Sequence, residues 1–188
     1  LAMPSAKEFL SGISEEDLAE VLTKYGDVTR ARRVAKAIVE LRNAGMMNTT
    51  GDLVRAVQTA FGTRRVPEEV RTVFQAIRIA VNDEYRWLES GLRQAIEALE
   101  PAGRLVVIAF HSGEDRIVKN VIKELATPRR VFHPDGRMKE CLSPVLKNLT
   151  PKPIKPSAEE CVSNPRAHSA RMRVAERVEL SREAELYP

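Results

Sequence analysis

The sequence predicts an α/β protein in two parts, a helical domain over residues 1–80 and a sheet-containing domain over residues 81–188. In the first part, apolar residues recur at helical spacing between capping residues. In the second part, residues 105–110 form an unbroken apolar run rich in β-branched side chains, which is typical of a strand covered on both faces. Residues 114–126 then show the periodicity of a helix, which predicts a strand, a sharp turn and a helix.

Capping residues divide the helical domain. A serine or threonine before an acidic or apolar-periodic segment favours a helix start, and glycine favours a helix end. The predicted helices begin at Ser14, Arg30 and Thr49 or Thr50, and they end at Tyr25–Asp27, Asn43–Gly45 and Gly62.

A fourth helical pattern runs from Pro67 to Pro101. Pro67 suits the first turn of a helix, and the apolar spacing continues throughout the segment. Because this segment is long for one helix of a globular protein, we expect a break near Asn82–Asp83, where the helical domain ends and the second domain begins.

The rest of the second domain alternates loops with short elements. We expect a Pro/Gly/Arg loop over 127–143, a short strand over 145–149 and a capped helix that starts at Ser157. Residues 169–178 alternate and predict a strand with one solvent-exposed basic face. The arginines on that face are Arg171, Arg173 and Arg177.

The charge distribution favours a polyanionic partner such as RNA. The net charge is +4, and between Arg129 and Arg177 there are 11 basic residues against 5 acidic ones. The longest apolar run is far shorter than the ~20 residues of a membrane span, so we expect no membrane association and a cytoplasmic location. Cys141 and Cys161 lie in no CxxC pair, and the three histidines are far apart, so we expect no metal site.

Candidate catalytic groups cluster directly after the predicted strand, where open α/β sheets bind their ligands. Residues 111–116 read His-Ser-Gly-Glu-Asp-Arg, and we take His111, Ser112 and Asp115 as the catalytic candidates. A purely structural interpretation stays open, with Ser112 as the helix cap and Glu114 and Asp115 complementing the helix dipole. Hydrolysis with Ser112 as nucleophile fits poorly, because the flanking residues do not form Gly-x-Ser-x-Gly.

Four segments in order resemble the bacterial methyltransferase family that modifies N4 of a cytidine in small-subunit ribosomal RNA. The most specific is Phe110-His111-Ser112-Gly113-Glu114-Asp115-Arg116, where the family has Leu at the position of Gly113. The other segments are Tyr25-Gly26 with residues 35–39, residues 72–84 around Phe74-Gln75-Ala76-Ile77-Arg78-Ile79, and Asn164-Pro165-Arg166-Ala167-His168-Ser169-Ala170-Arg171-Met172-Arg173.

The resemblance implies S-adenosyl-L-methionine as methyl donor and small-subunit ribosomal RNA, or the small ribosomal subunit, as partner. It implies that His111, Ser112 and Asp115 lie beside the target base, with Asp115 as the proton acceptor. The resemblance also implies residues that bind the substrate by lining the active site next to the target base and contacting RNA phosphates. They are Glu114, Asn164, Arg166, His168, Arg171, Arg173 and, as a weaker candidate, Arg78.

The resemblance also predicts that part of the family fold is absent. The family binds its donor through a glycine-rich loop upstream of these segments, and the sequence contains no Gly-x-Gly. Three predicted strands are fewer than the roughly seven of such a Rossmann-like sheet, and a bare apolar strand edge favours aggregation. We therefore expect the N-terminal donor-binding half, or a homodimer, to cover that edge. A non-catalytic RNA-binding or assembly module is the alternative function.

Overall fold

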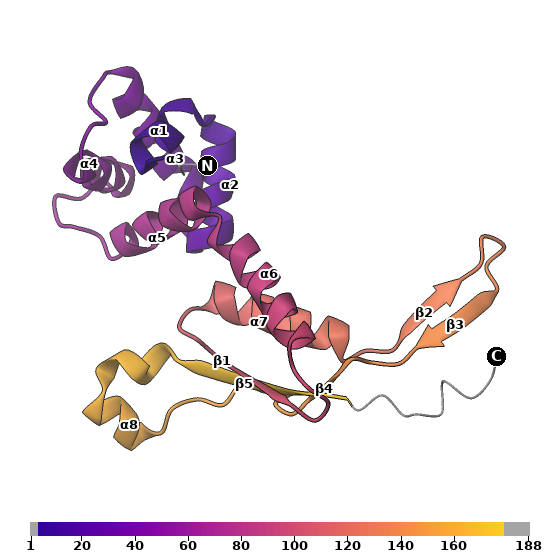
Figure 1. Cartoon of the computed structure of the whole chain (residues 1–188). Coiled ribbons are helices and arrows are strands. Elements are labelled where there is room, and N and C mark those ends of the chain that lie inside the picture. Colours follow the sequence, from indigo (N-terminus) through magenta and orange to yellow (C-terminus); the bar gives the residue numbers. More distant parts are fainter. Residues whose placement is uncertain (1–3, 179–188) are drawn as a thin grey trace. The chain divides into compact units, whose positions relative to one another are not determined.

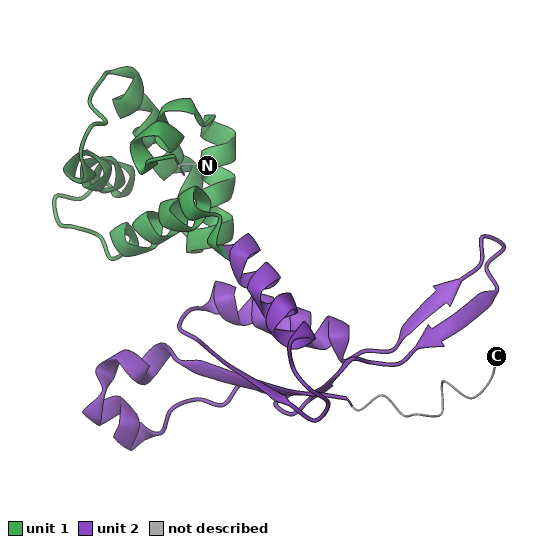
Figure 2. Ribbon diagram, in the orientation of Figure 1, with its two compact units in different colours: residues 1–84 green, residues 85–188 purple. Residues whose placement is uncertain are grey.

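The computed structural model describes residues 4–178 and divides the chain into two units, residues 1–84 and residues 85–188 (Figure 2). Over its described residues, the first unit contains helices and no strands, whereas the second combines helices with two small antiparallel sheets. Each unit has its own cluster of buried apolar side chains. The chain is therefore a mixed α/β protein. No helix within residues 4–178 is both long and apolar enough to cross a membrane.

The helices of the first unit begin where the capping residues predict. They are α1 (Ala6–Gly12), α2 (Glu15–Gly26), α3 (Ala31–Asn43), α4 (Thr50–Phe61) and α5 (Glu69–Asn82) (Figure 1). The side chains of Ser14 and Thr49 accept hydrogen bonds from the backbone of the third helical residue of α2 and α4. The predicted helix starts at Ser14 and Thr49 are thereby confirmed. The predicted start at Arg30 is also confirmed, although α3 has no side-chain cap, while α1, which Ser5 caps, was not predicted.

Close packing of α2 on α5 explains the glycine at the end of α2. A Cβ atom built on Gly26 would lie 2.7 Å from the carbonyl oxygen of Thr72 and 3.1 Å from the Cβ of Ala76. The surrounding core contains fully buried leucine, isoleucine and valine side chains, each of which contributes about 1.5–3 kcal/mol to the free energy of unfolding. These side chains include Leu18, Leu22, Val34, Ile38, Val57 and Val73.

The predicted break in the long helical pattern is confirmed. Asp83 adopts a left-handed backbone conformation, with φ of 50°, and separates α5 from α6 (Glu84–Glu97). A non-glycine residue rarely adopts this conformation unless it is Asn or Asp, so the Asn82–Asp83 pair suits the position.

The second unit is built on a three-stranded antiparallel sheet with the order β1-β5-β4. Its strands are β1 (Arg104–Ala109), β4 (Leu146–Asn148) and β5 (Arg171–Arg177). The predicted strand, turn and helix are confirmed, because β1 leads directly into α7 (Ser112–Leu125). Helices α6 and α7 cover one face of the sheet (Figure 1). The buried cluster between them includes Leu92, Ile96, Val118, Val121, Ile122, Leu146 and Ala175.

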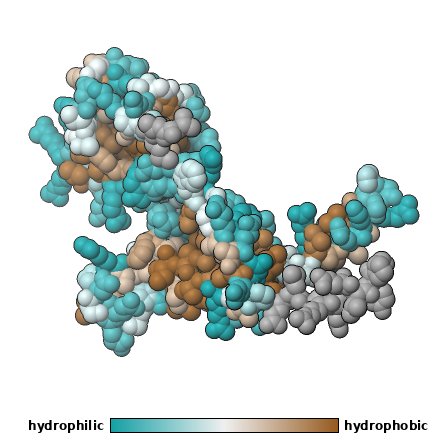
Figure 3. Space-filling view, in the orientation of Figure 1, coloured by the Kyte–Doolittle hydropathy of each residue, from teal (hydrophilic) through white to brown (hydrophobic). Residues whose placement is uncertain are grey.

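The opposite face of β1 is open, which corrects the expectation of a strand covered on both faces. Val106 and Ile108 are 55% and 54% exposed, whereas Leu105 and Val107 pack against the buried cluster. Hydrophobic side chains accordingly gather on the surface around β1 and α7 (Figure 3). In this chain β1 is also an edge strand, since β5 is its only neighbour in the described sheet.

The predicted loop over residues 127–143 is a β-hairpin instead. Strands β2 (Arg129–Phe132) and β3 (Met138–Leu142) pair antiparallel around the predicted turn, which contains Gly136 at φ of 83°. Nearly every side chain of the hairpin is exposed, so no hydrophobic alternation marks its strands in the sequence.

The prediction of a solvent-exposed basic face on β5 is wrong. Arg173 is buried, with 4% of its surface exposed, and Arg171 and Arg177 are half-buried. Arg177 donates hydrogen bonds to the carbonyl oxygens of Glu97 and Leu99 at 2.6 and 2.7 Å, near the end of α6. These arginines hold the sheet to its helices because their side chains point toward the covered face.

Candidate active site

The corner between β1 and α7 is held by a reciprocal pair of backbone contacts. The Nδ1 atom of His111 accepts a hydrogen bond from the backbone N–H of Glu114 at 3.3 Å, and the Glu114 carboxylate accepts one from the backbone N–H of Phe110 at 3.0 Å. His111 is therefore the helix cap, and Ser112 is the first helical residue. The interpretation of Ser112 as the cap is wrong, because an imidazole occupies the capping position.

The other imidazole nitrogen of His111 is buried. Nε2 lies 3.0 Å from Oε1 of Glu114 without forming a well-aligned hydrogen bond, and it has no other partner among the described residues. The ring stacks on Tyr85 of α6, with 6.0 Å between ring centroids and 30° between the planes. Sequence reasoning missed Tyr85, since nothing in its neighbourhood marks a contact with a residue 26 positions away.

Gly113 leaves the space that the Tyr85 ring occupies. A Cβ atom built on Gly113 would overlap the phenolic oxygen of Tyr85 and would lie 3.3 Å from Nδ1 of His111. Glycine at this position thus lets the phenol pack against the corner.

Asp115 lies two residues after Gly113 on α7 and is tied to β5. Arg173 donates two hydrogen bonds to its carboxylate, Nε to Oδ1 at 2.6 Å and Nη2 to Oδ2 at 2.9 Å, and Arg171 approaches Oδ2 at 3.5 Å. Asp115 and Arg173 are both buried. Hydrogen bonds from Arg173, together with the charges of Arg173 and Arg171, lower the pKa of Asp115 against the opposing effect of burial.

This pairing determines what Asp115 can do. A carboxylate that holds its charge firmly and has both oxygens engaged is a poor proton acceptor. Of the two carboxylates at the corner, Glu114 is the more accessible, with 31% of its side chain exposed against 9% for Asp115.

Asn164, Arg166 and His168 lie at the same end of the sheet as the corner. Asn164 ends α8 (Ala158–Ser163), and Arg166 and His168 belong to the short 3₁₀ helix η1 (Pro165–Ser169), all three with exposed side chains. This helix leads into Arg171, which pairs with Ala109 at the end of β1. The antiparallel register therefore brings the two polar segments together.

Arg78 belongs to the helical unit. Its guanidinium contacts the Glu84 carboxylate, with Nε to Oε1 at 2.8 Å, and Asn82 donates to the same oxygen at 3.1 Å. Arg78 also lines an apolar hollow of about 400 Å³ between α1, α4 and α5. The structure therefore gives Arg78 a local partner within its own unit.

The described residues contain no cluster of three His, Cys, Asp or Glu side chains that could hold a metal ion. The free thiols of Cys141 and Cys161 lie on β3 and α8.

These features define an α/β protein with a polar strand-to-helix corner. Residues 2–178 match the MraW methylase family, and the chain belongs to that family.

Three curated relatives bear the name ribosomal RNA small subunit methyltransferase H. The relative from Thermomicrobium roseum is 47% identical over 169 residues, which cover 88% of this chain and 51% of the relative. The relative from Methylococcus capsulatus is 44% identical over 92% of this chain and 57% of its own length. The relative from Fusobacterium nucleatum is 39% identical over 93% of this chain and 55% of its own length. The chain thus spans about half the length of the curated relatives that it matches.

Proposed function

We propose that this chain is the substrate-binding part of an adenosylmethionine-dependent methyltransferase that modifies N4 of a cytidine in small-subunit ribosomal RNA. Family membership and the names of the relatives support the reaction class. The observation that carries the residue assignment is the juxtaposition, at one end of the sheet, of the His111 corner with the exposed segment from Asn164 to His168.

The chemistry explains which groups such a site needs. The exocyclic amine of cytosine is a weak nucleophile because its lone pair is delocalised into the ring, so the base has to be held out of its stack and aimed at the methyl group. In this proposal the extruded base lies against the His111 ring and forms a hydrogen bond with Ser112. Arg166 and His168 bind the flanking phosphates.

We assign different roles to the carboxylates of Asp115 and Glu114. Asp115 is a positioning residue, since its ion pair with Arg173 fixes α7 on β5 and so orients the corner. Glu114 accepts the proton that the amine loses once it carries the methyl group. Its Oε1 atom lies beside His111 and is not the oxygen that binds the backbone of Phe110.

The methyl donor is assigned to the part of the family protein that this chain does not cover. The chain has no Gly-x-Gly, so it offers no glycine-rich cradle for adenosylmethionine, and we assign none of its residues to donor contacts. The exposed face and free edge of β1, which carry Val106 and Ile108, are the surfaces that the missing half of a Rossmann-like sheet would cover. A homodimer is the competing way to cover them.

A non-catalytic RNA-binding module is the second candidate function. The absence of a donor cradle and the basic, exposed hairpin β2–β3 favour it. It predicts RNA binding without methyl transfer under every condition.

The test completes the chain with the segment that the Thermomicrobium roseum relative has and this chain lacks. Transfer of a tritiated methyl group to unmodified small ribosomal subunits is measured, and digested RNA is analysed for N4-methylcytidine by mass spectrometry. We expect transfer by the completed protein, loss of transfer with Glu114→Gln, and normal transfer with the hairpin control Asp135→Asn. RNA binding without transfer would establish the non-catalytic module instead, and tight binding of adenosylmethionine by this chain alone would refute the donor assignment.

A further inference from the structure

Two segments of the helical unit are rich in arginine and contain no acidic residue. They are residues 28–36, which read Val-Thr-Arg-Ala-Arg-Arg-Val-Ala-Lys, and residues 62–67, which read Gly-Thr-Arg-Arg-Val-Pro. The arginines of both segments are exposed. Within residues 4–178, the side chains of Arg33, Arg64 and Arg65 form no ion pair or hydrogen bond.

One contact brings the two segments together. The guanidinium of Arg30 lies 4.9 Å from the ring centroid of Phe61, the last residue of α4. Gly62, at φ of 67°, then turns the chain, so the second segment starts beside Arg30.

The backbone of the second segment is fixed by local hydrogen bonds. The side-chain amide of Gln58 donates to the carbonyl oxygen of Arg64 at 2.8 Å, and the Arg65 backbone N–H donates to the Thr63 hydroxyl at 3.1 Å. Arg64 and Arg65 are therefore presented from an ordered turn, which lowers the entropy cost of binding a ligand there.

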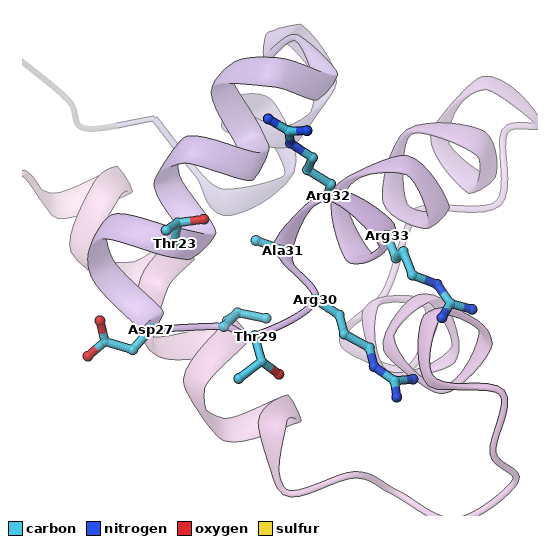
Figure 4. A pocket seen from close by; sticks show the side chains of 8 residues that line it. Thr23, Asp27, Thr29, Arg30, Ala31, Arg32 and Arg33 are labelled. Atoms are coloured by element: carbon cyan, nitrogen blue, oxygen red, sulfur yellow. The ribbon is translucent and has the colours of Figure 1, made fainter.

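The start of α3 borders an open hollow of about 640 Å³. Figure 4 shows that Arg30 and Arg33 extend to the same side of the chain, whereas Asp27 points the other way and Arg32 leaves in a different direction. Arg32 also lines a neighbouring hollow, whose acidic residues are Glu15, Glu16 and Glu20 of α2. The positive charges of Arg30 and Arg33 thus lie apart from the carboxylates of α2.

Stability does not explain this arrangement. The first turn of α3 has no acidic residue and no side-chain cap, so Arg32 and Arg33 sit at the positive end of the helix dipole and are repelled by it. In contrast, α2 carries three acidic residues in its first turn.

We propose that Arg30, Arg33, Arg64 and Arg65 form a surface that binds the phosphate backbone of RNA. Arginine suits this ligand, because its planar fork of N–H donors matches phosphate oxygens in pairs. Phosphate contacts fix the position of an RNA without reading its sequence, so the surface anchors the substrate while other residues select the base. The inference rests on the proposed function for the identity of the polyanion.

The test measures binding of the full chain to a fluorescein-labelled single-stranded RNA of 30 nucleotides by fluorescence anisotropy across a range of KCl concentrations. The double variant Arg33→Gln/Arg64→Gln should bind about tenfold more weakly in 0.1 M salt, with a slope of log affinity against log salt reduced by about 1.4, since each lost phosphate contact removes about 0.7. The control Arg32→Gln/Lys36→Gln also removes two positive charges, both from α3. Its affinity for the RNA should stay within about twofold of that of the original chain.

An equal loss of RNA affinity in the two double variants would show that net charge alone drives binding and would overturn the proposal. Unchanged RNA affinity in both variants would also overturn it. Preferential binding of phosphatidylserine vesicles over RNA, abolished by Arg33→Gln/Arg64→Gln, would also overturn it. Circular dichroism melting should be the same for both variants. If the completed protein binds RNA through this surface but transfers no methyl group, the proposed function fails while the surface stands.

Discussion

Arg173 on the central strand of the sheet and Asp115 on α7 form a buried, two-pronged ion pair across 58 residues of sequence. The pair connects β5, which follows the exposed segment of η1, with α7, whose start forms the corner. We therefore expect substitutions at Asp115 to affect folding.

Asp115→Ala should lower the free energy of unfolding by about 3–5 kcal/mol, because it leaves the Arg173 guanidinium buried without a counter-charge. Urea unfolding followed by circular dichroism measures the effect. The double variant Asp115→Ala/Arg173→Met should recover much of the loss, since it removes both charges.

A surface pair provides the control. Arg104 contacts Glu176 at 2.8 Å but is 65% exposed, so Arg104→Ala should cost less than about 1 kcal/mol. Equal losses for Asp115→Ala and Arg104→Ala would contradict a dominant role for the buried pair.

The depressed pKa of Asp115 makes stability depend on acid pH. The pKa in the folded protein lies below the unfolded value of about 3.9, so the stabilisation is fully present above pH 4 and is lost as the pH falls through the folded pKa. Asp115→Asn should therefore cost most at pH 7 and progressively less toward pH 2. Unfolding free energies of both proteins across this range test the prediction, and a cost that stays constant with pH would refute it.

Local signals in the sequence predicted the helical unit apart from α1. Ser14 and Thr49 act on backbone groups three residues away, and the break at Asp83 depends on the conformation of a single residue. Such features can be predicted because cause and effect lie within one helical turn.

Long-range pairing explains what the sequence could not reveal. The alternating arginines of β5 resemble a solvated face, and only the fold shows that Asp115 meets Arg173 there. The stacking of Tyr85 on His111 is equally non-local. The hairpin β2–β3 was missed for another reason, since its exposed strands have no hydrophobic pattern to detect. The candidate site residues themselves were predicted from family resemblance and from their place after an apolar strand, and their roles stay predictions.

Gly113→Ala should be destabilising by about 1–3 kcal/mol, because the added methyl group overlaps the Tyr85 phenol and forces it to move. Thermal unfolding measures the change. The second-site variant Tyr85→Ala should remove this penalty from Gly113→Ala, since the overlapping ring is then gone.

Gly91→Ala on α6 is the matched control, because nothing lies within 4 Å of a Cβ at that position. Alanine favours a helix over glycine, so Gly91→Ala should raise stability by about 0.5–1 kcal/mol. If Gly113→Ala were stabilising to the same degree, the space beside Tyr85 would not constrain the corner.

Two substitutions separate the capping role of His111 from its role toward the base. His111→Ala removes the cap of α7 and should cost about 1 kcal/mol of stability, whereas Asn is itself a favoured capping residue, so His111→Asn should preserve stability. In the completed protein, both variants should lose methyl transfer if the imidazole contacts the base. Full transfer by His111→Asn would reduce His111 to a helix cap, and the contact with the base would then have to come from Ser112.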